Sequence, residues 1–368
     1  MISIAREILL HDKVRLGITI VSLAFAIVMI VYNLGMFFGT LSESVSLIDH
    51  ARADLWVLEE GHRDIYSPSL LSLSTLRWAR RAPGVVQACG LNLLGGNLLI
   101  QNNHPVMVVA VDPDCALLQP WGVRLGDASD LRRKDAIIVD DYTLRSDPTY
   151  LGDTVELNGL EMQVVAVTHN NKSFTTPYVY VSRQTFASLN GGEEHFNYVM
   201  VQLAPMTNPE DTIHRLASDN DDLAAFLSGE FRSASMLALV SQGLGVIFVV
   251  VAVGVVVGLL IITMTTYTAT MERLRDFAIL KAIGATRRKI LGIVVEQAAA
   301  ETLLGFGAGL AASLGLNYIV ETFAGLRGSF PAVAILGALA ILLALAMLGS
   351  LISVRKAVSV DPTVVFRA

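Results

Sequence analysis

A run of 22 residues without a charged side chain, from Gly17 to Phe38, limits what this chain can fold into. A helix needs about 20 apolar residues to cross the hydrocarbon core of a bilayer, so this run predicts a membrane helix. Three further apolar runs follow at Met236–Thr263, Ile290–Val320 and Pro331–Ser353. The chain is 53% hydrophobic and 16% charged, whereas soluble domains have about 25% charged residues. The sequence therefore predicts four transmembrane helices.

The distribution of charge predicts the orientation of these helices. Residues 40–232 contain 25 acidic and 14 basic residues, a net charge of −11. The short polar segments 1–15, 266–290 and 353–368 together contain 12 basic and 5 acidic residues. Basic residues in short loops mark the cytoplasmic side of a membrane. We therefore expect all three short segments in the cytoplasm and residues 40–232 outside it, which agrees with an even number of spans.

Residues 40–232 have the pattern of one large mixed α+β extracytoplasmic domain between the first and second membrane helices. Helical spacing is found at Pro68–Ala82, Thr212–Ser218 and Leu223–Phe231, and the last of these could continue as a stalk into the second membrane helix. Asn158-Gly159 is a two-residue hairpin signal. Strands are expected at 53–61, 106–111, 136–139, 154–157, 162–167 and 178–181.

Motifs for catalysis, metal binding or nucleotide binding are missing from the sequence. There is no G-x-x-x-x-G-K-[ST] phosphate loop, no H-E-x-x-H and no G-x-S-x-G. We therefore expect no catalytic site, cofactor or metal on this chain. We interpret the acidic pairs Asp140-Asp141 and Glu193-Glu194 as solvated loops. Basic patches with interleaved aromatic residues are also missing, which argues against nucleic acid as a partner. Cys89 and Cys115 could form a disulfide or remain two thiols.

The polar segment between the second and third apolar runs has a composition that topology alone does not explain. Thr270–Ile290 carries six basic residues against two acidic ones, which would fix its side of the membrane. Within it the sequence FAILKAIGA is largely apolar yet has charge on both sides. Such a core predicts a docking element for a cytoplasmic partner, with Gly284 able to adopt positive φ in the turn.

This segment, MERLRDFAILKAIGATRRKI, resembles the signature of FtsX-like permeases of the MacB type. The C-terminal VRKAVSVDPTVVFRA is similar to the family's basic stretch followed by Asp-Pro and a terminal Arg. LGDTVELNGLEMQVVAV is similar to a turn and strand of its periplasmic domain. The layout resembles DevC-type permeases, without the ATPase domain that some MacB-type members carry at the N-terminus.

The resemblance implies the permease subunit of an ABC-type exporter in the bacterial inner membrane, with its large domain in the periplasm. The partners it implies are a separate ATP-binding cassette ATPase, which holds the ATP and Mg²⁺, a second copy of the chain, a periplasmic adaptor and an outer-membrane duct. The permease itself would not be an enzyme and would transmit motion to the periplasmic domain. The residues expected to couple to the ATPase are Glu272, Arg273, Arg275, Phe277, Leu280, Lys281, Ile283, Gly284 and Arg287.

Two alternative functions share this layout. One is a signalling scaffold like FtsX itself, which activates a cell-wall hydrolase, and the other is a lipoprotein-releasing permease.

The sequence predicts the following domain boundaries. They are an interfacial helix on membrane lipid at 1–15, a first span at 16–39, the periplasmic domain at 40–232, a stalk and second span at 233–265, a cytoplasmic coupling loop at 266–289, a third span at 290–320, a periplasmic turn at 321–330, a fourth span at 331–353 and a cytoplasmic tail at 354–368.

Polar and small residues within the apolar runs are further candidates. Acidic residues inside a membrane helix usually face a partner, which makes Glu296 and Glu301 candidate intramembrane polar sites. They are five positions apart and cannot share one narrow helix face, and Glu296 could lie near the interface. The pairs Gly254/Gly258 and Gly305/Gly309 predict close helix packing, either within the chain or across a homodimer.

Overall fold

The computed structural model describes residues 13–144, 147–173, 175–191, 195–219, 222–242, 245–272, 279 and 285–359. The chain divides into two units. We call the first, 1–39 with 245–368, the helical unit, and the second, Thr40–Leu244, the α+β domain. The expected interfacial helix 1–15 falls mainly outside the described residues, and helix α2 is described from Lys13 to Ser44.

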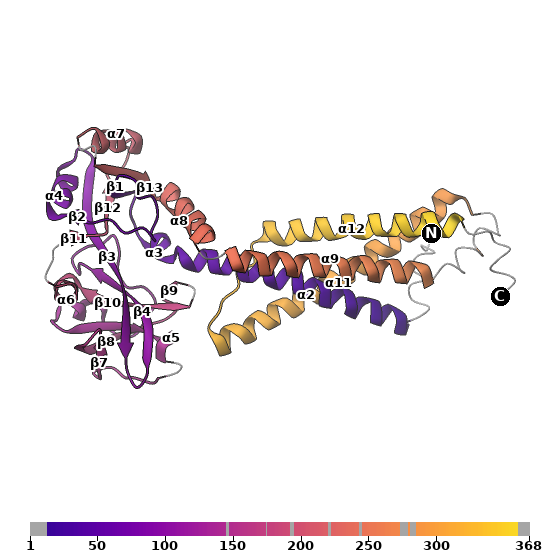
Figure 1. Ribbon diagram of the computed structural model, residues 1–368, viewed down its shortest axis with the longest axis horizontal. Coiled ribbons are helices and arrows are strands. Elements are labelled where there is room, and N and C mark those ends of the chain that lie inside the picture. The colour runs from indigo at the N-terminus through magenta and orange to yellow at the C-terminus, as the bar shows by residue number, and fades with distance from the viewer. Residues whose placement is uncertain are drawn as a thin grey trace. The chain divides into compact units, whose positions relative to one another are not determined.

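Four long helices contribute to the helical unit and run lengthwise along one another (Figure 1). They are α2, α9 (Gly245–Glu272), α11 (Arg287–Ala324) and α12 (Ala332–Ser359). Among the described residues, three stretches are long and apolar enough to span a membrane: Leu16–Ser44, Arg288–Ala324 and Ala332–Gly349. The corresponding stretch of α9, Ala252–Thr265, is shorter. The second span expected from the sequence therefore stays a prediction.

Glycines let α2 approach two other helices closely. A Cβ atom built at Gly258 of α9 would lie 2.6 Å from Ile30, and one at Gly309 of α11 would lie 2.7 Å from Ile27. Gly254 and Gly305 similarly face Asn33 and Leu23 of α2. Both small-residue pairs predicted from the sequence thus pack inside the chain, against α2. Their presence gives no support to a homodimer.

The connection between α11 and α12 also packs on α2. Helix α11 ends at Ala324, and the φ of 68° at its capping residue Gly325 lies in the left-handed region that favours glycine. The Ser329 amide donates a hydrogen bond of 2.8 Å to the Gly35 carbonyl. A Cβ atom at Gly39 would lie only 2.2 Å from the Arg327 carbonyl oxygen, so glycine is required there.

The α+β domain is built on an 11-stranded sheet. Nine of its strands follow the order β13-β1-β12-β3-β4-β10-β6-β8-β5, while β7 pairs with β3 and β8, and β9 pairs with β10. β4 and β10 are parallel, as are β6 and β8, and the other neighbours along this order are antiparallel. The strands are β1 (Leu55–Glu59), β3 (Val85–Leu99), β4 (Asn103–Val111), β5 (Val123–Gly126), β6 (Ala136–Asp140), β7 (Thr154–Leu157), β8 (Leu160–Thr168), β9 (Lys172–Ser173), β10 (Thr176–Ser182), β12 (Tyr198–Leu203) and β13 (Leu223–Leu227). A second small sheet pairs β2 (Leu71–Ser72) with β11 (His195–Phe196).

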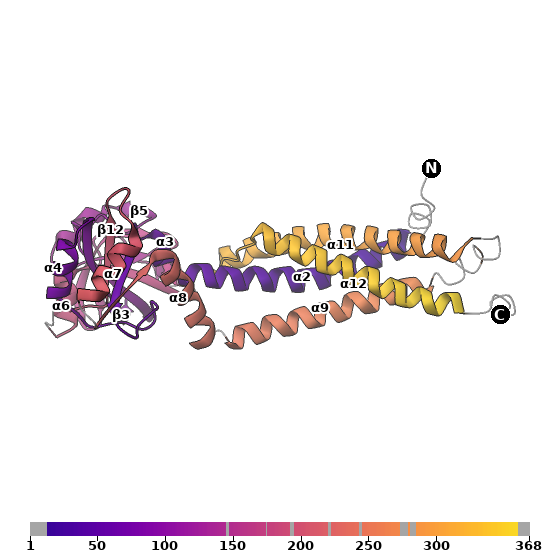
Figure 2. The ribbon, with the colours of Figure 1, turned by 90° about the horizontal axis from the view of Figure 1, so that it is seen from above.

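Short helices pack around the large sheet (Figures 1 and 2). α4 contacts β3, α7 contacts the edge strand β13, α6 contacts β10 and β4, and α5 follows β6. The short helices are α3 (Ser46–His50), α4 (Leu73–Arg81), η1 (Ala128–Arg132), α5 (Asp141–Leu144), α6 (Arg183–Leu189), α7 (Pro209–Asp219) and α8 (Ser228–Gln242).

The long strand β3 joins two halves of the sheet. Its first half pairs with β12 and its second half with β4. Cys89 of β3 forms a disulfide with Cys115, with the two Cα atoms 6.2 Å apart. The bridge lies in the largest buried apolar cluster, which also contains Trp56, Tyr198 and Phe231. The sequence had left the disulfide and two free thiols as alternatives.

Most predicted elements are present, but one is of the wrong type. All six expected strands are found, and the Asn158-Gly159 turn has φ of 49° and 87°, as a type I′ hairpin turn requires. The segment Leu223–Phe231 was predicted as a helix, yet Leu223–Leu227 is strand β13. Pairing with the exposed edge of β1 outweighs its weak helical pattern, and the helix α8 begins only at Ser228.

Candidate functional site

The last turn of α2 belongs to the α+β domain and is held there by a buried ion pair. Helix α2 is continuous from the apolar stretch to Ser44. The carboxylate of Glu43 lies 2.6 Å from the ammonium group of Lys172 on β9. The two side chains are only 13% and 3% exposed. Removing either charge would leave the other without its main counter-ion in a poorly solvated place.

Aromatic and hydroxyl groups complete this attachment. The Lys172 ammonium lies 5.5 Å from the ring centroid of Tyr142, which is cation–π geometry. The Tyr66 hydroxyl donates a 2.9 Å hydrogen bond to the Ser44 carbonyl at the end of α2. Burial raises the pKa of the Tyr66 hydroxyl, so it remains a protonated donor at neutral pH. Ser46 of α3 donates to the Lys172 carbonyl at 3.0 Å.

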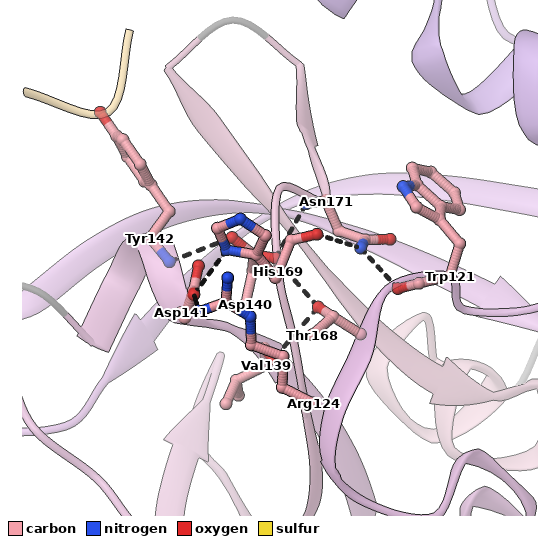
Figure 3. A network of polar contacts seen from close by, with 9 residues as sticks. All are labelled: Trp121, Arg124, Val139, Asp140, Asp141, Tyr142, Thr168, His169 and Asn171. Carbon is pink, nitrogen blue, oxygen red and sulfur yellow. Dashed lines mark hydrogen bonds and ion pairs between the residues drawn. The ribbon is translucent and has the colours of Figure 1, made fainter. Parts of the chain in front are cut away.

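A buried carboxyl group fixes the residues that lead into β9 (Figure 3). Asp140 ends β6, is fully buried, and accepts hydrogen bonds from the Asn171 amide at 2.8 Å, the Thr168 hydroxyl at 3.0 Å and the Tyr142 amide at 3.0 Å. Burial raises the pKa of Asp140 to about 6, against the opposing effect of the hydrogen bonds from Asn171, Tyr142 and Thr168. The prediction of a solvated loop is wrong for Asp140, because parallel β6 and β8 bring these donors to its carboxyl.

Asn171 is held on three sides, next to Lys172. Its backbone amide donates the hydrogen bond to Asp140 described above. Its side chain donates to the Trp121 carbonyl at 2.7 Å and accepts from the Tyr180 hydroxyl at 2.6 Å. Asp141 lies 2.7 Å from the His169 ring nitrogen, as Figure 3 shows, and 3.3 Å from Arg124. This network fixes the backbone that presents Lys172 to Glu43.

A second attachment joins the helix that follows α2 to the helix that precedes α9. Arg232 of α8 makes two bonds to the carboxylate of Asp49 of α3, at 2.5 and 3.1 Å. This fork geometry fixes orientation as well as distance. The rest of α8 is also anchored in the domain, since Phe231 stacks on Trp56 with centroids 4.8 Å apart. The chain segments that lead to and from the helical unit are therefore tied together inside the α+β domain.

The predicted coupling residues are mostly outside the described part of the chain. Glu272 ends α9 and Arg287 begins α11. The others, Arg273, Arg275, Phe277, Leu280, Lys281, Ile283 and Gly284, fall outside the described residues, as do Glu193 and Glu194.

The predicted intramembrane acids lie on different faces of α11. Glu296 is exposed, while Glu301 is 5% exposed and its neighbour Gln297 is 4% exposed. The role of both residues as intramembrane polar sites stays a prediction. No cluster of three or more metal-binding side chains is found among the described residues.

Sequence reasoning missed all four ion-pair residues of the attachment. Glu43 and Lys172 are 129 positions apart, and Asp49 and Arg232 are 183 apart. No spacing rule connects residues at such separations. A signal was present only for Lys172, a lone basic residue just before the strand-like run at 178–181.

These features define a class of protein in which apolar helices carry a large α+β domain inserted after the first helix. The model of the MacB-like periplasmic core domain matches residues 16–218, and that of the FtsX-like permease C-terminal region matches 248–362. The chain belongs to the family of FtsX-like, MacB-type ABC transporter permeases. This confirms the resemblance seen in the sequence.

The chain is also similar to curated relatives and to domains of solved structures. An uncharacterised ABC transporter permease of Mycobacterium tuberculosis strain H37Rv is 25% identical over 364 residues, 96% of each chain. One of Mycobacterium bovis is 23% identical over 366 residues, again 96% of each. The periplasmic region of MacB from Actinobacillus actinomycetemcomitans has 13% identity, covers 51% of this chain and 94% of its own, and gives a TM-score of 0.39. The extracellular domain of the transporter YknZ from Gram-positive bacteria has 15% identity, covers 47% of this chain and 98% of its own, and gives a TM-score of 0.36.

Proposed function

We propose that this permease transmits ATP-driven motion across the bacterial inner membrane to its α+β domain in the periplasm, and so drives export. The continuous helix α2 is the observation that carries the proposal. Movement of α2 reaches the domain through Glu43 and Lys172 rather than being lost in a linker. Because β9 is fixed in turn by Asn171 and Asp140, that movement is passed to the sheet.

The topology of the proposal has four spans, with both termini and residues 266–289 in the cytoplasm. The net charge of −11 over 40–232 and the basic short segments support it. The Cys89–Cys115 disulfide supports an oxidising compartment for the α+β domain. α9 would be the second of these four spans along the chain.

Two sequence features support the proposed partners: the missing phosphate-binding loop and the apolar FAILKAIGA core. The sequence has no phosphate-binding loop, so ATP and Mg²⁺ would be held by a separate ATPase subunit. This ATPase would bind the apolar FAILKAIGA core. A second copy of the permease would complete a symmetric pair, and an adaptor and an outer-membrane duct would receive the substrate from the periplasm.

A distance measurement tests the proposal without knowledge of the substrate. Both native cysteines are in the disulfide, so cysteines introduced at Glu161 and Phe323, both exposed, can carry spin labels selectively. The labelled permease is diluted with unlabelled copies and assembled with its ATPase. Double electron–electron resonance should show a different distance between the two spin labels with ATP and vanadate than without nucleotide. An unchanged separation would overturn the proposal.

A further inference from the structure

A cavity in the α+β domain lies away from the end of α2 and has no part in the mechanism above. It has a volume of about 300 Å³, the lower limit for small-molecule pockets. Its wall is formed by α6, the middle of β3 and the short strand β11, which lie near one another in Figure 1. The residues that matter for its chemistry are Asn92, Arg183, Gln184, Phe186, His195 and Phe196.

The base of this cavity is apolar and built into the fold. Phe186 and Phe196 are 4% and 2% exposed and belong to two different buried clusters. A Cβ atom at Gly90 of β3 would lie 2.0 Å from the Phe196 ring. Glycine at this position therefore allows the Phe196 ring to pack directly against the backbone of β3.

The polar rim carries one positive charge. The Arg183 guanidinium lies 5.8 Å from the ring centroid of Phe196, in cation–π geometry. The side chain of Arg183 is exposed, and within the described part of the domain no carboxylate pairs with it. This is unusual in a segment with 25 acidic residues and 14 basic ones. An exposed guanidinium has a planar set of donors that is suited to a carboxylate or a phosphate.

Neutral hydrogen-bonding groups surround this charge. Asn92 is 1% exposed and donates a 2.7 Å hydrogen bond to the His195 carbonyl, which holds β11 in place. The amide of Gln184 and the imidazole of His195 also line the cavity. No acidic residue is among the described residues that line it. Arg183 is the charged side chain among these described lining residues, and its positive charge favours an anion over a cation.

We infer that this cavity binds a small organic anion, with its acidic group on Arg183 and an aromatic or aliphatic body against Phe186 and Phe196. The inference concerns binding by this chain alone and does not depend on the transport role proposed above. It predicts that charge and apolar body are both required of the ligand.

Photolabelling of the full-length permease in detergent tests the inference and reports the location of binding. The probe is 4-benzoylbenzoate, an anionic aromatic ketone, and uncharged benzophenone is its matched control. Peptide mass spectrometry should map anionic adducts to residues 183–196. Benzophenone should label these peptides much less than the anion does, while detergent-embedded helices take up both probes.

Two variants and one control make the test specific. Arg183→Gln should lower the labelling by about tenfold, the effect expected for one charge-assisted hydrogen bond at a partly exposed site. Ala187→Trp should fill the cavity and abolish the labelling, even if Arg183→Gln perturbs the start of α6. Arg132→Gln, which removes an exposed arginine paired with Asp114, should leave it unchanged. Equal labelling by both probes, or labelling that neither cavity variant lowers, would overturn the inference.

Discussion

The ammonium group of Lys172 lies 2.6 Å from the carboxylate of Glu43, although 129 positions separate the two residues. Lys172→Met should lower the free energy of unfolding of the α+β domain by about 3–5 kcal/mol, since it leaves a buried carboxylate without its partner. The double variant Glu43→Leu/Lys172→Met should recover most of this loss, because apolar groups can replace a buried pair. Urea unfolding followed by tryptophan fluorescence measures the domain alone, since Trp56, Trp78 and Trp121 all lie in it.

The control for this prediction is the more exposed pair between Asp49 and Arg232, whose side chains are 35% and 37% exposed. Arg232→Gln should cost at most about 1 kcal/mol, because solvent screens exposed pairs. Equal losses for Lys172→Met and Arg232→Gln would contradict the idea that burial gives the Glu43 pair its importance.

The buried carboxyl of Asp140 predicts a pH dependence of stability. Burial raises its pKa from 3.8 to about 6 on folding. Between these values the folded domain binds more protons than the unfolded chain, so the contribution of Asp140 is greatest in acid and is lost as the pH rises from about 4 to about 6. The difference between the unfolding free energies of wild type and Asp140→Asn should fall by up to ~3 kcal/mol over this window. A difference that is independent of pH would refute the assignment.

Glycine contacts inside the helical unit predict a sharp contrast between neighbouring positions. Gly309→Leu and Gly258→Leu should overpack α2 and cost about 1–3 kcal/mol each, seen as lower thermal stability in detergent. Gly307→Leu is the matched control, since a Cβ atom there meets nothing within 4 Å. If Gly307→Leu were as damaging as Gly309→Leu, the packing of α11 on α2 would be wrong.

The coupling segment predicts that apolar contacts matter more than charge for ATPase binding. Replacing Phe277, Leu280 and Ile283 with alanine should abolish copurification of the ATPase, because the docking surface loses its apolar area. Replacing Arg288 and Lys289 with glutamine should weaken it only slightly, since both side chains are exposed at the start of α11. Intact copurification of the triple alanine variant would exclude this segment as the docking element.

The sequence was informative where periodicity or composition carries the signal. The length of the apolar runs predicted the long helices, and Asn158-Gly159 predicted the hairpin between β7 and β8. Both features depend on residues that are neighbours in the sequence. The strand β3 was missed since Gly95 and Gly96 interrupt it and its pairing with two different strands stabilises it. The same holds for β13, whose strand form depends on pairing with β1.

The attachment site could not be predicted, because its residues come together only through the topology of the sheet. Asp140 reads as half of an acidic pair in the sequence, and only the parallel pairing of β6 and β8 places Thr168 against it. Lys172 meets Glu43 through the position of β9 beside β10. In contrast, the small-residue pairs were identified from the sequence, but the helix that they face was not.

The central claim is that α2 passes motion to the α+β domain as a stiff helix. Thr40→Gly/Leu41→Gly would soften α2 between the helical unit and Glu43, at a cost of about 1 kcal/mol per glycine in helix propensity, while Thr40→Ala/Leu41→Ala would keep it helical. The ATP-dependent change in label separation between positions 161 and 323 is the direct measurement. We expect the change to persist in the alanine variant and to be lost in the glycine variant, with ATP hydrolysis retained in both. The same change in both variants would contradict transmission through α2.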